Sequence, residues 1–210
     1  VMHSWFSQMV RGIGEGRRLS EDQVRALIDR GPFLGREALE AKLVDGLAYR
    51  DEIHQKVKQK AGAGAELLAW GAYLDRAGRP HASGPTIALI YGAGGVRRGK
   101  SGFDPLFGEA AMGSDTVGAA FREAIEDKDV KAILFRIDSP GGSYVASDTI
   151  WRETARARKA RKPVIASMGD LAGSGGYFVA MAADKIVAQP GTITGSIGVL
   201  GGKMYTPGFW

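Results

Sequence analysis

The sequence predicts an α/β domain with a largely parallel sheet, preceded by a helical segment. Three observations predict it. Residues 1–60 have helical periodicity, and from residue 85 onward apolar runs of strand length alternate with helical stretches. The chain has 31 glycines, and they cluster in residues 92–118 and 169–202, where 17 of them lie beside the apolar runs. Such clusters beside strands indicate tight turns or a close approach of the backbone to something else.

Residues 1–60 are expected to form helices separated by short breaks. Ser20 and Gln23 have the spacing of a capping box, and the pair Gly31 and Pro32 is expected to end the helix that begins there. Residues 61–84 are mixed and rich in Ala and Gly, so they are expected to connect two units, with some helix around residues 67–74. Two further helices are expected before this connection, at residues 36–44 and 50–60.

Strands and helices alternate in the rest of the chain, which is typical of a parallel sheet with crossover helices. The expected strands are 86–91, 132–138, 163–168, 185–189 and 193–200. The expected helices are 114–126, 146–160 and 174–182. The expected loops are a long glycine-rich loop at 92–114 and turns at 139–143 and 169–173.

Composition excludes several kinds of site. The chain has no cysteine, and His3, His54 and His81 are far apart in the sequence, so neither a thiolate nor a histidine metal site is expected. The net charge of +5 is too diffuse to name a partner, and no nucleic-acid partner is predicted. No apolar run approaches the roughly 18 residues that span a bilayer. We expect any membrane anchor to lie outside this chain.

One motif suggests nucleotide binding but has the wrong context. Residues 94–101 match the phosphate-binding pattern G-x-x-x-x-G-K-[ST]. That site needs a helix beginning at Gly-Lys-Ser, whose first amides hold the phosphate. Gly102 and Pro105 oppose such a helix, and Arg136 interrupts the apolar strand before the acidic residue Asp138. We interpret the segment as a surface loop.

Two glycine-rich turns carry the residues best suited to chemistry. Each follows a predicted parallel strand and precedes a helix, where α/β folds place reactive groups. Ser174, in the second turn, is flanked by glycines at the expected start of a helix. The amide of Gly175 is a natural donor to an oxyanion, and an amide of Gly141 or Gly142 in the first turn would complete an oxyanion hole. The alternative for Ser174 is a serine that only caps its helix.

No histidine follows Ser174, and Ala172 replaces the first glycine of G-x-S-x-G, so a Ser–Asp–His hydrolase is not expected. A serine can instead be activated by a lysine that burial keeps neutral. Asp138 and Asp170 are expected to cap or turn the chain.

Three motifs in this order resemble the signal peptide peptidase A (SppA) family. They are S-P-G-G-S at 139–143, M-G-D-L-A-G-S-G-G-Y at 168–177 and A-D-K-I-V-A-Q-P-G-T-I-T-G-S-I-G-V at 183–199. The resemblance implies a Clp protease/crotonase fold of repeated strand–strand–helix units. Residues 29–52 look like the end of the preceding repeat in the long, tandem form of the family. The implied organisation is a helical tail of that repeat at 1–60, a linker at 61–84 and a truncated catalytic-serine domain at 85–210.

The resemblance also assigns roles. Ser174 matches the nucleophile of a Ser–Lys endopeptidase, Gly142 and Gly175 match the oxyanion-hole amides, and Ser196 matches a serine that orients the catalytic lysine. The lysine itself is expected outside this chain, so the isolated chain should be nearly inactive. The lysines that do not match the family base are Lys100, Lys131, Lys185 and Lys203.

Further expectations come from the resemblance alone. The substrates would be remnant signal peptides or other hydrophobic peptides at a membrane. The protein would be a ring-like homo-oligomer, associated with the membrane through segments outside this chain, with its catalytic domain on the periplasmic or extracytoplasmic side. No metal or cofactor is implied.

Two other functions stay open. A crotonase-like acyl-CoA enzyme would use the same paired amides to polarise a thioester, and an inactive scaffold or oligomerisation module would use neither turn. A basic helix end is interpreted as a solvated face, with contact to anionic lipid as the alternative. Its residues are Arg152, Arg156, Arg158, Lys159, Arg161 and Lys162.

Overall fold

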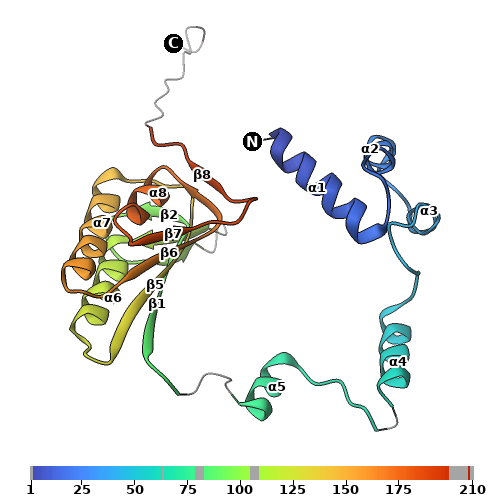
Figure 1. The fold of residues 1–210 in the computed structure, drawn as a ribbon, viewed down its shortest axis with the longest axis horizontal. Coiled ribbons are helices and arrows are strands. Elements are labelled where there is room, and N and C mark those ends of the chain that lie inside the picture. Colours follow the sequence, from blue (N-terminus) through green and yellow to red (C-terminus); the bar gives the residue numbers. More distant parts are fainter. Residues whose placement is uncertain (1, 63, 79–82, 105–108, 199–207, 209–210) are drawn as a thin grey trace. The chain divides into compact units, whose positions relative to one another are not determined.

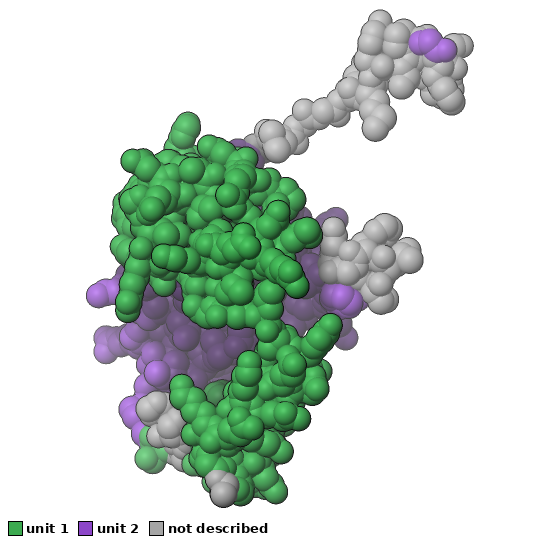
Figure 2. Space-filling view, turned by 90° about the vertical axis from the view of Figure 1, so that its right-hand side faces the viewer, with its two compact units in different colours: residues 1–83 green, residues 84–210 purple. Residues whose placement is uncertain are grey.

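The computed structural model of the chain describes all residues except 1, 63, 79–82, 105–108, 199–207 and 209–210. The chain divides into two compact units, Val1–Ser83 and Gly84–Trp210 (Figures 1 and 2). The assignment of residues 1–60 to the end of a preceding repeat stays a prediction, and each unit is described by itself below.

The first unit is helical, as predicted. The capping box is present: the Ser20 hydroxyl accepts the N–H of Gln23 at 3.2 Å, and the Gln23 side chain accepts the N–H of Ser20 at 2.9 Å. Val10 and Val24, from the first two helices, are its buried apolar side chains among the described residues. Its helices are α1 (Met2–Arg17), α2 (Glu21–Arg30), α3 (Gly35–Glu40), α4 (Arg50–Ala61) and α5 (Trp70–Ala77).

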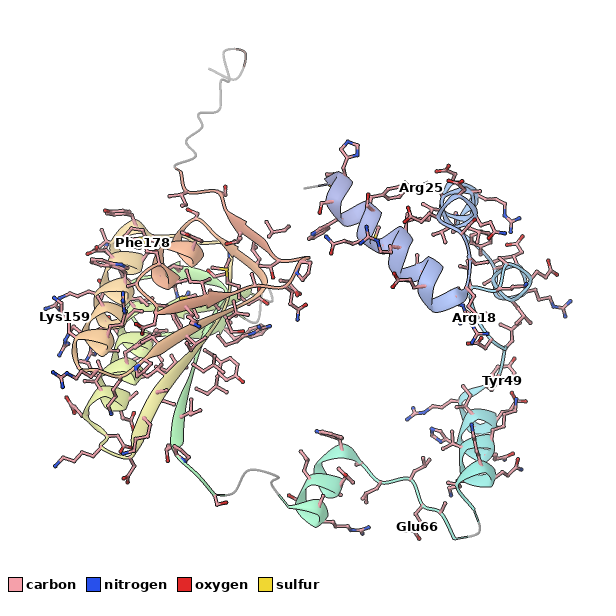
Figure 3. All side chains as sticks on the ribbon, in the orientation of Figure 1. Arg18, Arg25, Tyr49, Glu66, Lys159 and Phe178 are labelled. Atoms are coloured by element: carbon pink, nitrogen blue, oxygen red, sulfur yellow. The ribbon has the colours of Figure 1, made fainter. Side chains whose placement is uncertain are left out.

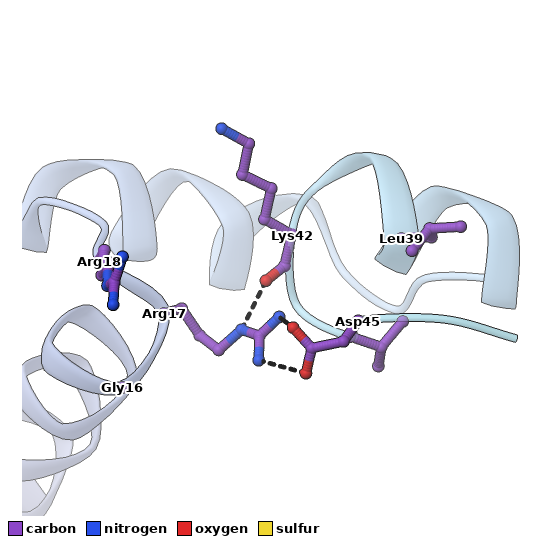
Figure 4. Close-up of a pocket in the computed structure, with 7 residues that line it drawn as sticks. Gly16, Arg17, Arg18, Leu39, Lys42 and Asp45 are labelled. Carbon is purple, nitrogen blue, oxygen red and sulfur yellow. Dashed lines mark hydrogen bonds and ion pairs between the residues drawn. The ribbon is translucent and has the colours of Figure 1, made fainter. Parts of the chain in front are cut away.

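An ion pair joins the end of α1 to the turn after α3. The Arg17 guanidinium donates to both carboxylate oxygens of Asp45, at 2.9 and 3.0 Å, and its Nε donates to the carbonyl of Lys42 at 2.6 Å (Figure 4). The hydrogen bonds from Arg17 hold the pKa of Asp45 below its usual value. Arg17 and Asp45 line the hollow beside this pair and already satisfy one another, and we assign it no ligand.

The second unit is built on a parallel sheet, which confirms the predicted fold class. Its strand order is β1-β5-β6-β7, and β8 also pairs with β6 beyond the end of β7; every pairing is parallel. The strands are β1 (Thr86–Ala93), β5 (Val130–Ser139), β6 (Val164–Gly173), β7 (Lys185–Val187) and β8 (Ile193–Gly195).

Three helices provide the crossovers, and the longer two cover one face of the sheet (Figure 1). They are α6 (Ser114–Glu126), α7 (Tyr144–Lys159) and α8 (Gly175–Ala180). The core between helices and sheet is apolar; Phe121 of α6 meets Phe135 of β5 edge to face, with ring centroids 5.1 Å apart. On β1, Ile90 is buried while its neighbours Leu89 and Tyr91 are exposed, because successive side chains of a strand point to opposite faces.

Two predicted loops contain strands. The expected loop at 92–114 includes a small second sheet in the order β2-β4-β3, formed by β2 (Gly95–Arg97), β3 (Gly102–Asp104) and β4 (Glu109–Gly113). The expected turn at 169–173 belongs to β6, because Leu171–Gly173 pair with Ile193–Gly195 of β8. Leu171–Gly173 were missed because their strand partner lies further along the sequence. Strands β2, β3 and β4 were missed because they are short and contain few β-branched or aromatic side chains.

The basic end of α7 is partly engaged within the chain. Arg156 pairs with the buried Glu153 at 2.9 Å, and the Lys162 ammonium donates to the carbonyl of Ala124 at 2.6 Å, at the end of α6. Lys159 projects from the outer side of this helix (Figure 3). Arg158 also has a partner, Asp184, so three of the six basic residues are bound within the chain. No helix in the described part of the chain is long and apolar enough to cross a membrane.

Asp184 joins the end of α7 to the start of β6. Its carboxylate accepts the N–H of Val164 at 2.8 Å and the Nε–H of Arg158 at 2.8 Å. The hydrogen bond from Val164 and the nearby Arg158 lower the pKa of Asp184 from its ordinary value of 3.8.

We predict that Asp184→Ala lowers the free energy of unfolding by about 1–3 kcal/mol at pH 7, because the buried N–H of Val164 loses its acceptor. Since the pKa of Asp184 is lower in the folded state, the carboxylate stabilises the fold above pH 3.8 and loses this effect as the pH falls through the folded-state pKa. The difference between the two proteins should therefore shrink in acid. Urea unfolding between pH 3 and 7 measures it. The control Asp148→Ala, at an exposed position of α7, should change the stability by less than about 0.5 kcal/mol.

Candidate active site

Ser174 alone joins β6 to α8. Its backbone has φ +49° and ψ −115°, a conformation that residues other than glycine rarely adopt and that costs about 1–3 kcal/mol. Both backbone groups are held: the N–H donates to the carbonyl of Gly195 at 2.7 Å, and the carbonyl accepts the N–H of Phe178 at 3.0 Å. The structure thus keeps a strained serine at an abrupt change from strand to helix.

The hydroxyl of Ser174 is not used as a helix cap. Ser174 occupies the N-cap position of α8, but its side chain accepts no hydrogen bond from the first turn. The residue is half-buried, so its side chain is not sealed in the interior. Within the described part of the chain no group is hydrogen-bonded to this hydroxyl, which leaves it available for chemistry. The alternative of a purely capping serine is wrong.

The two glycine-rich turns are in direct contact. A Cβ placed on Gly141 would lie 2.6 Å from the nitrogen of Gly175 and 2.8 Å from the Cβ of Ser174. A Cβ placed on Gly175 would lie 3.2 Å from the nitrogen of Gly142. Side chains at Gly141 or Gly175 would therefore force the turns apart.

The amide hydrogens of these turns divide into engaged and unengaged groups. The N–H of Gly141 donates to Ser139 Oγ at 3.1 Å, and the N–H of Ser143 donates to the carbonyl of Val96 at 2.8 Å. Between them, the N–H of Gly142 has no acceptor among the described residues. Gly175 is the first residue of α8, so its N–H has no acceptor within the helix. Both predicted oxyanion donors are thus among the unengaged amides of the described residues, while their joint aim at one point stays a prediction.

The predicted lysine-orienting residue lies next to the serine along the sheet. Gly173 of β6 is in register with Gly195 of β8, so Ser196 follows β8 at the same level as Ser174 follows β6. Ser196 is exposed and also has a positive φ, of 49°.

Among the described residues, no lysine makes a contact that identifies it as the general base. Lys131 donates to the carbonyl of Lys128 at 2.7 Å, on the surface before β5. Lys203 lies outside the described residues. The expectation that the general base comes from another part of the protein stays a prediction.

Residues of the nucleotide-like motif at 94–101 form hydrogen bonds with neighbouring parts of the fold. The carbonyl of Gly99 accepts the N–H of Asp115 at 2.9 Å, and the Ser101 hydroxyl accepts the N–H of Gly113 at 2.9 Å. The N–H of Ser101 donates to Thr116 Oγ1, and strand β3, not a helix, begins at Gly102. The segment lacks the helix that a phosphate site needs, as predicted.

Sequence reasoning missed one buried polar residue between the turns. Ser139 ends β5, is fully buried and bonds both to Gly141 and, through its hydroxyl proton, to the carbonyl of Gly94. The available signal was a serine directly after the predicted strand 132–138, in front of the first glycine pair. Asp138 was predicted to cap or turn the chain, and its carboxylate accepts the N–H of Leu171 at 3.2 Å. Among the described residues, no group of three His, Asp or Glu side chains could hold a metal ion.

Known proteins with similar sequences include several peptidases. A model of peptidase family S49 matches residues 156–208. Protease 4 of Salmonella typhi is 37% identical over 200 residues, covering 90% of this chain and 31% of that protein. The chloroplastic serine protease SPPA of Arabidopsis thaliana is 35% identical over 209 residues, covering 95% of this chain and 30% of that protein. The chain thus spans about a third of the length of these relatives.

Solved structures also resemble part of the chain. A mutant of the membrane-bound stomatin-specific protease 1510-N aligns with a TM-score of 0.38 and 21% identity, covering 53% of this chain and 48% of that one. A mutant of ClpP1 from Listeria monocytogenes aligns with a TM-score of 0.33 and 17% identity, covering 45% and 46%. We base the fold class on the sheet itself.

Two matched variants, Ser174→Ala and Ser174→Gly, test whether the backbone of Ser174 is strained. Ser174→Ala and Ser174→Gly both remove the hydroxyl, but only glycine relieves the backbone conformation. Replacing alanine by glycine within regular structure normally costs about 0.5–1 kcal/mol. We predict the opposite sign here: the glycine variant should unfold at higher urea concentration than the alanine variant. A glycine variant less stable than the alanine variant would show that position 174 is not strained.

Proposed function

Because this chain belongs to peptidase family S49, the SppA family, we propose that it carries the nucleophile and oxyanion amides of a serine endopeptidase. One observation supports this most directly. A strained serine with an unengaged hydroxyl lies against a glycine turn that presents an unengaged amide. Backbone strain of this kind concentrates at active sites, where the surrounding structure must maintain it.

The proposed reaction begins with attack of Ser174 Oγ on a peptide carbonyl. A neutral lysine takes the hydroxyl proton as the new C–O bond forms, and the carbonyl oxygen becomes an oxyanion. The N–H groups of Gly142 and Gly175 donate to that oxyanion; losing one such donor typically costs about 2.7–4 kcal/mol of transition-state stabilisation. The lysine then protonates the leaving amine as the C–N bond breaks. Water, deprotonated by the same lysine, releases the acyl group from Ser174.

The lysine must be neutral to act as a base, so its pKa has to lie several units below the usual value of about 10.4. We propose that it comes from a part of the protein outside this chain, as in the tandem form of the family. We propose that Ser196, which follows β8 at the level at which Ser174 follows β6, orients the lysine amine.

The proposed substrates are extended hydrophobic peptides, including remnant signal peptides. Backbone approach to Ser174 needs the small residues on either side of it, Gly173 and Gly175. We further propose a ring-like homo-oligomer held at a membrane by segments outside this chain, with its catalytic domain on the extracytoplasmic side. These proposals rest on family membership.

The acyl-CoA alternative has less support from the site. Polarising a thioester requires the two amides but not a hydroxyl between them. A serine at this position that costs strain and makes no capping bond would then have no purpose.

We expect Ser174→Ala in the full-length protein to lower peptidase kcat by at least about 10³-fold, since the nucleophile is lost. A fluorophosphonate probe should label the parent protein and leave the variant unlabelled. The control Ser114→Ala removes another buried serine hydroxyl, 3.4 Å from the Asp115 carboxylate, and should keep parent activity. Peptide cleavage by the Ser174→Ala protein at the parent rate would reject the proposed nucleophile.

The isolated 210-residue chain tests the source of the base. Without an external lysine, probe labelling of Ser174 should be at least about 10²-fold slower than in the full-length protein, in line with the usual contribution of a general base. Second-order labelling rates at pH 8 measure the difference. Equal rates would mean that a lysine within this chain serves as the base.

A further inference from the structure

The direction of the Gly142 N–H is not determined by steric limits. Gly141 and Gly142 have φ values of +98° and +150°, and two successive glycines allow the peptide between them to rotate at little steric cost. An oxyanion hole requires donors that already point at the reacting oxygen, since reorientation during the reaction costs free energy. Other contacts must therefore hold this turn.

Hydrogen bonds from two sides hold the turn. On one side, β2 brackets Gly142: the N–H of Val96 donates to the carbonyl of Gly141, and the carbonyl of Val96 accepts the N–H of Ser143, both at 2.8 Å. On the other side, the N–H of Gly141 donates to Ser139 Oγ at 3.1 Å. Ser139 is the side chain that completes this arrangement.

The hydroxyl of Ser139 can hold only one orientation. It has a single proton, which it donates to the carbonyl of Gly94 at 2.7 Å, so a lone pair faces the N–H of Gly141. Gly94 directly precedes β2, and its own N–H donates to the carbonyl of Asp138 at 2.8 Å. The hydroxyl therefore ties the Pro140–Gly141 peptide, which directly precedes the peptide that carries the Gly142 N–H, to Gly94 at the start of the strand that brackets Gly142.

Ser139 also packs against the helix that carries the second donor. A Cβ placed on Gly176 would lie 2.7 Å from the carbonyl oxygen of Ser139 and 3.2 Å from its Cβ. Gly176 follows Gly175 in the first turn of α8. A single fully buried residue thus contacts the segments of both unengaged amides.

We propose that Ser139 is a positioning residue for the oxyanion hole. Its hydroxyl fixes the Pro140–Gly141 peptide on one side of Gly141, while Val96 holds the Gly141 carbonyl on the other, and together they keep the Gly142 N–H directed toward the place beside Gly175 where the oxyanion forms. This inference rests on the proposed peptidase function, which assigns the two amides their role. Ser139 itself does not touch the substrate.

The test uses Ser139→Ala in the full-length protein. Loosening one donor should lower kcat by about 10–100-fold, somewhat less than the 10²–10³-fold that loss of a donor causes, while KM stays within about twofold. Rates are expressed per active site titrated with a fluorophosphonate, so that a variant that is only partly folded is not counted as slow. Ser114→Ala is again the control and should match the parent protein.

A second variant covers the case in which Ser139→Ala does not fold. Ser139→Cys keeps a weak donor and acceptor at the same position, and its kcat per titrated site should lie between the parent and the alanine variant. If either folded variant has parent kcat per titrated site, Ser139 has only a structural role and the proposal is overturned. If a Ser139 variant keeps parent kcat while Ser174→Ala is inactive, the proposed peptidase function stands and only the role of Ser139 is rejected. If Ser174→Ala is active, both proposals are wrong.

Discussion

The arrangement of the site depends on backbone-to-backbone contact between two turns. Parallel pairing of β5 with β6 brings the carboxyl ends of both strands to the same edge of the sheet. The turns can then touch only because Gly141 and Gly175 have no side chains; a methyl group on either would lie within 2.5–2.8 Å of the opposite turn or of α7. Close packing of this kind tolerates almost no added volume.

This contact also explains how the fold maintains a strained serine. The Ser174 backbone is held at both ends by hydrogen bonds, from β8 on one side and from within α8 on the other. The stability of the sheet offsets a local cost of about 1–3 kcal/mol. The result is a hydroxyl that neither caps its helix nor is sealed in the core, next to amides left without partners.

The small sheet has a supporting role in this arrangement. It is formed by residues that sequence reasoning treated as a long loop, yet β2 brackets Gly142 and Gly94 accepts the Ser139 hydroxyl proton. The glycine-rich segment at 94–101, which has the pattern of a nucleotide site, is thus part of the scaffold of the candidate active site. Backbone groups of Gly94, Val96, Gly99 and Ser101 are hydrogen-bonded within the fold.

The sequence by itself determined the α/β class, the helical first unit and which two turns form the candidate site. Apolar runs, capping residues such as Ser20, and glycines beside Ser174 are local signals, and local signals depend on near neighbours in the chain. Only the tertiary structure decided that β6 continues to Gly173, that the turns touch, and that Ser139 connects them. These features arise from pairing with residues tens of positions away, such as Ile193–Gly195 with Leu171–Gly173, and no local pattern encodes which distant backbone group will accept a given N–H.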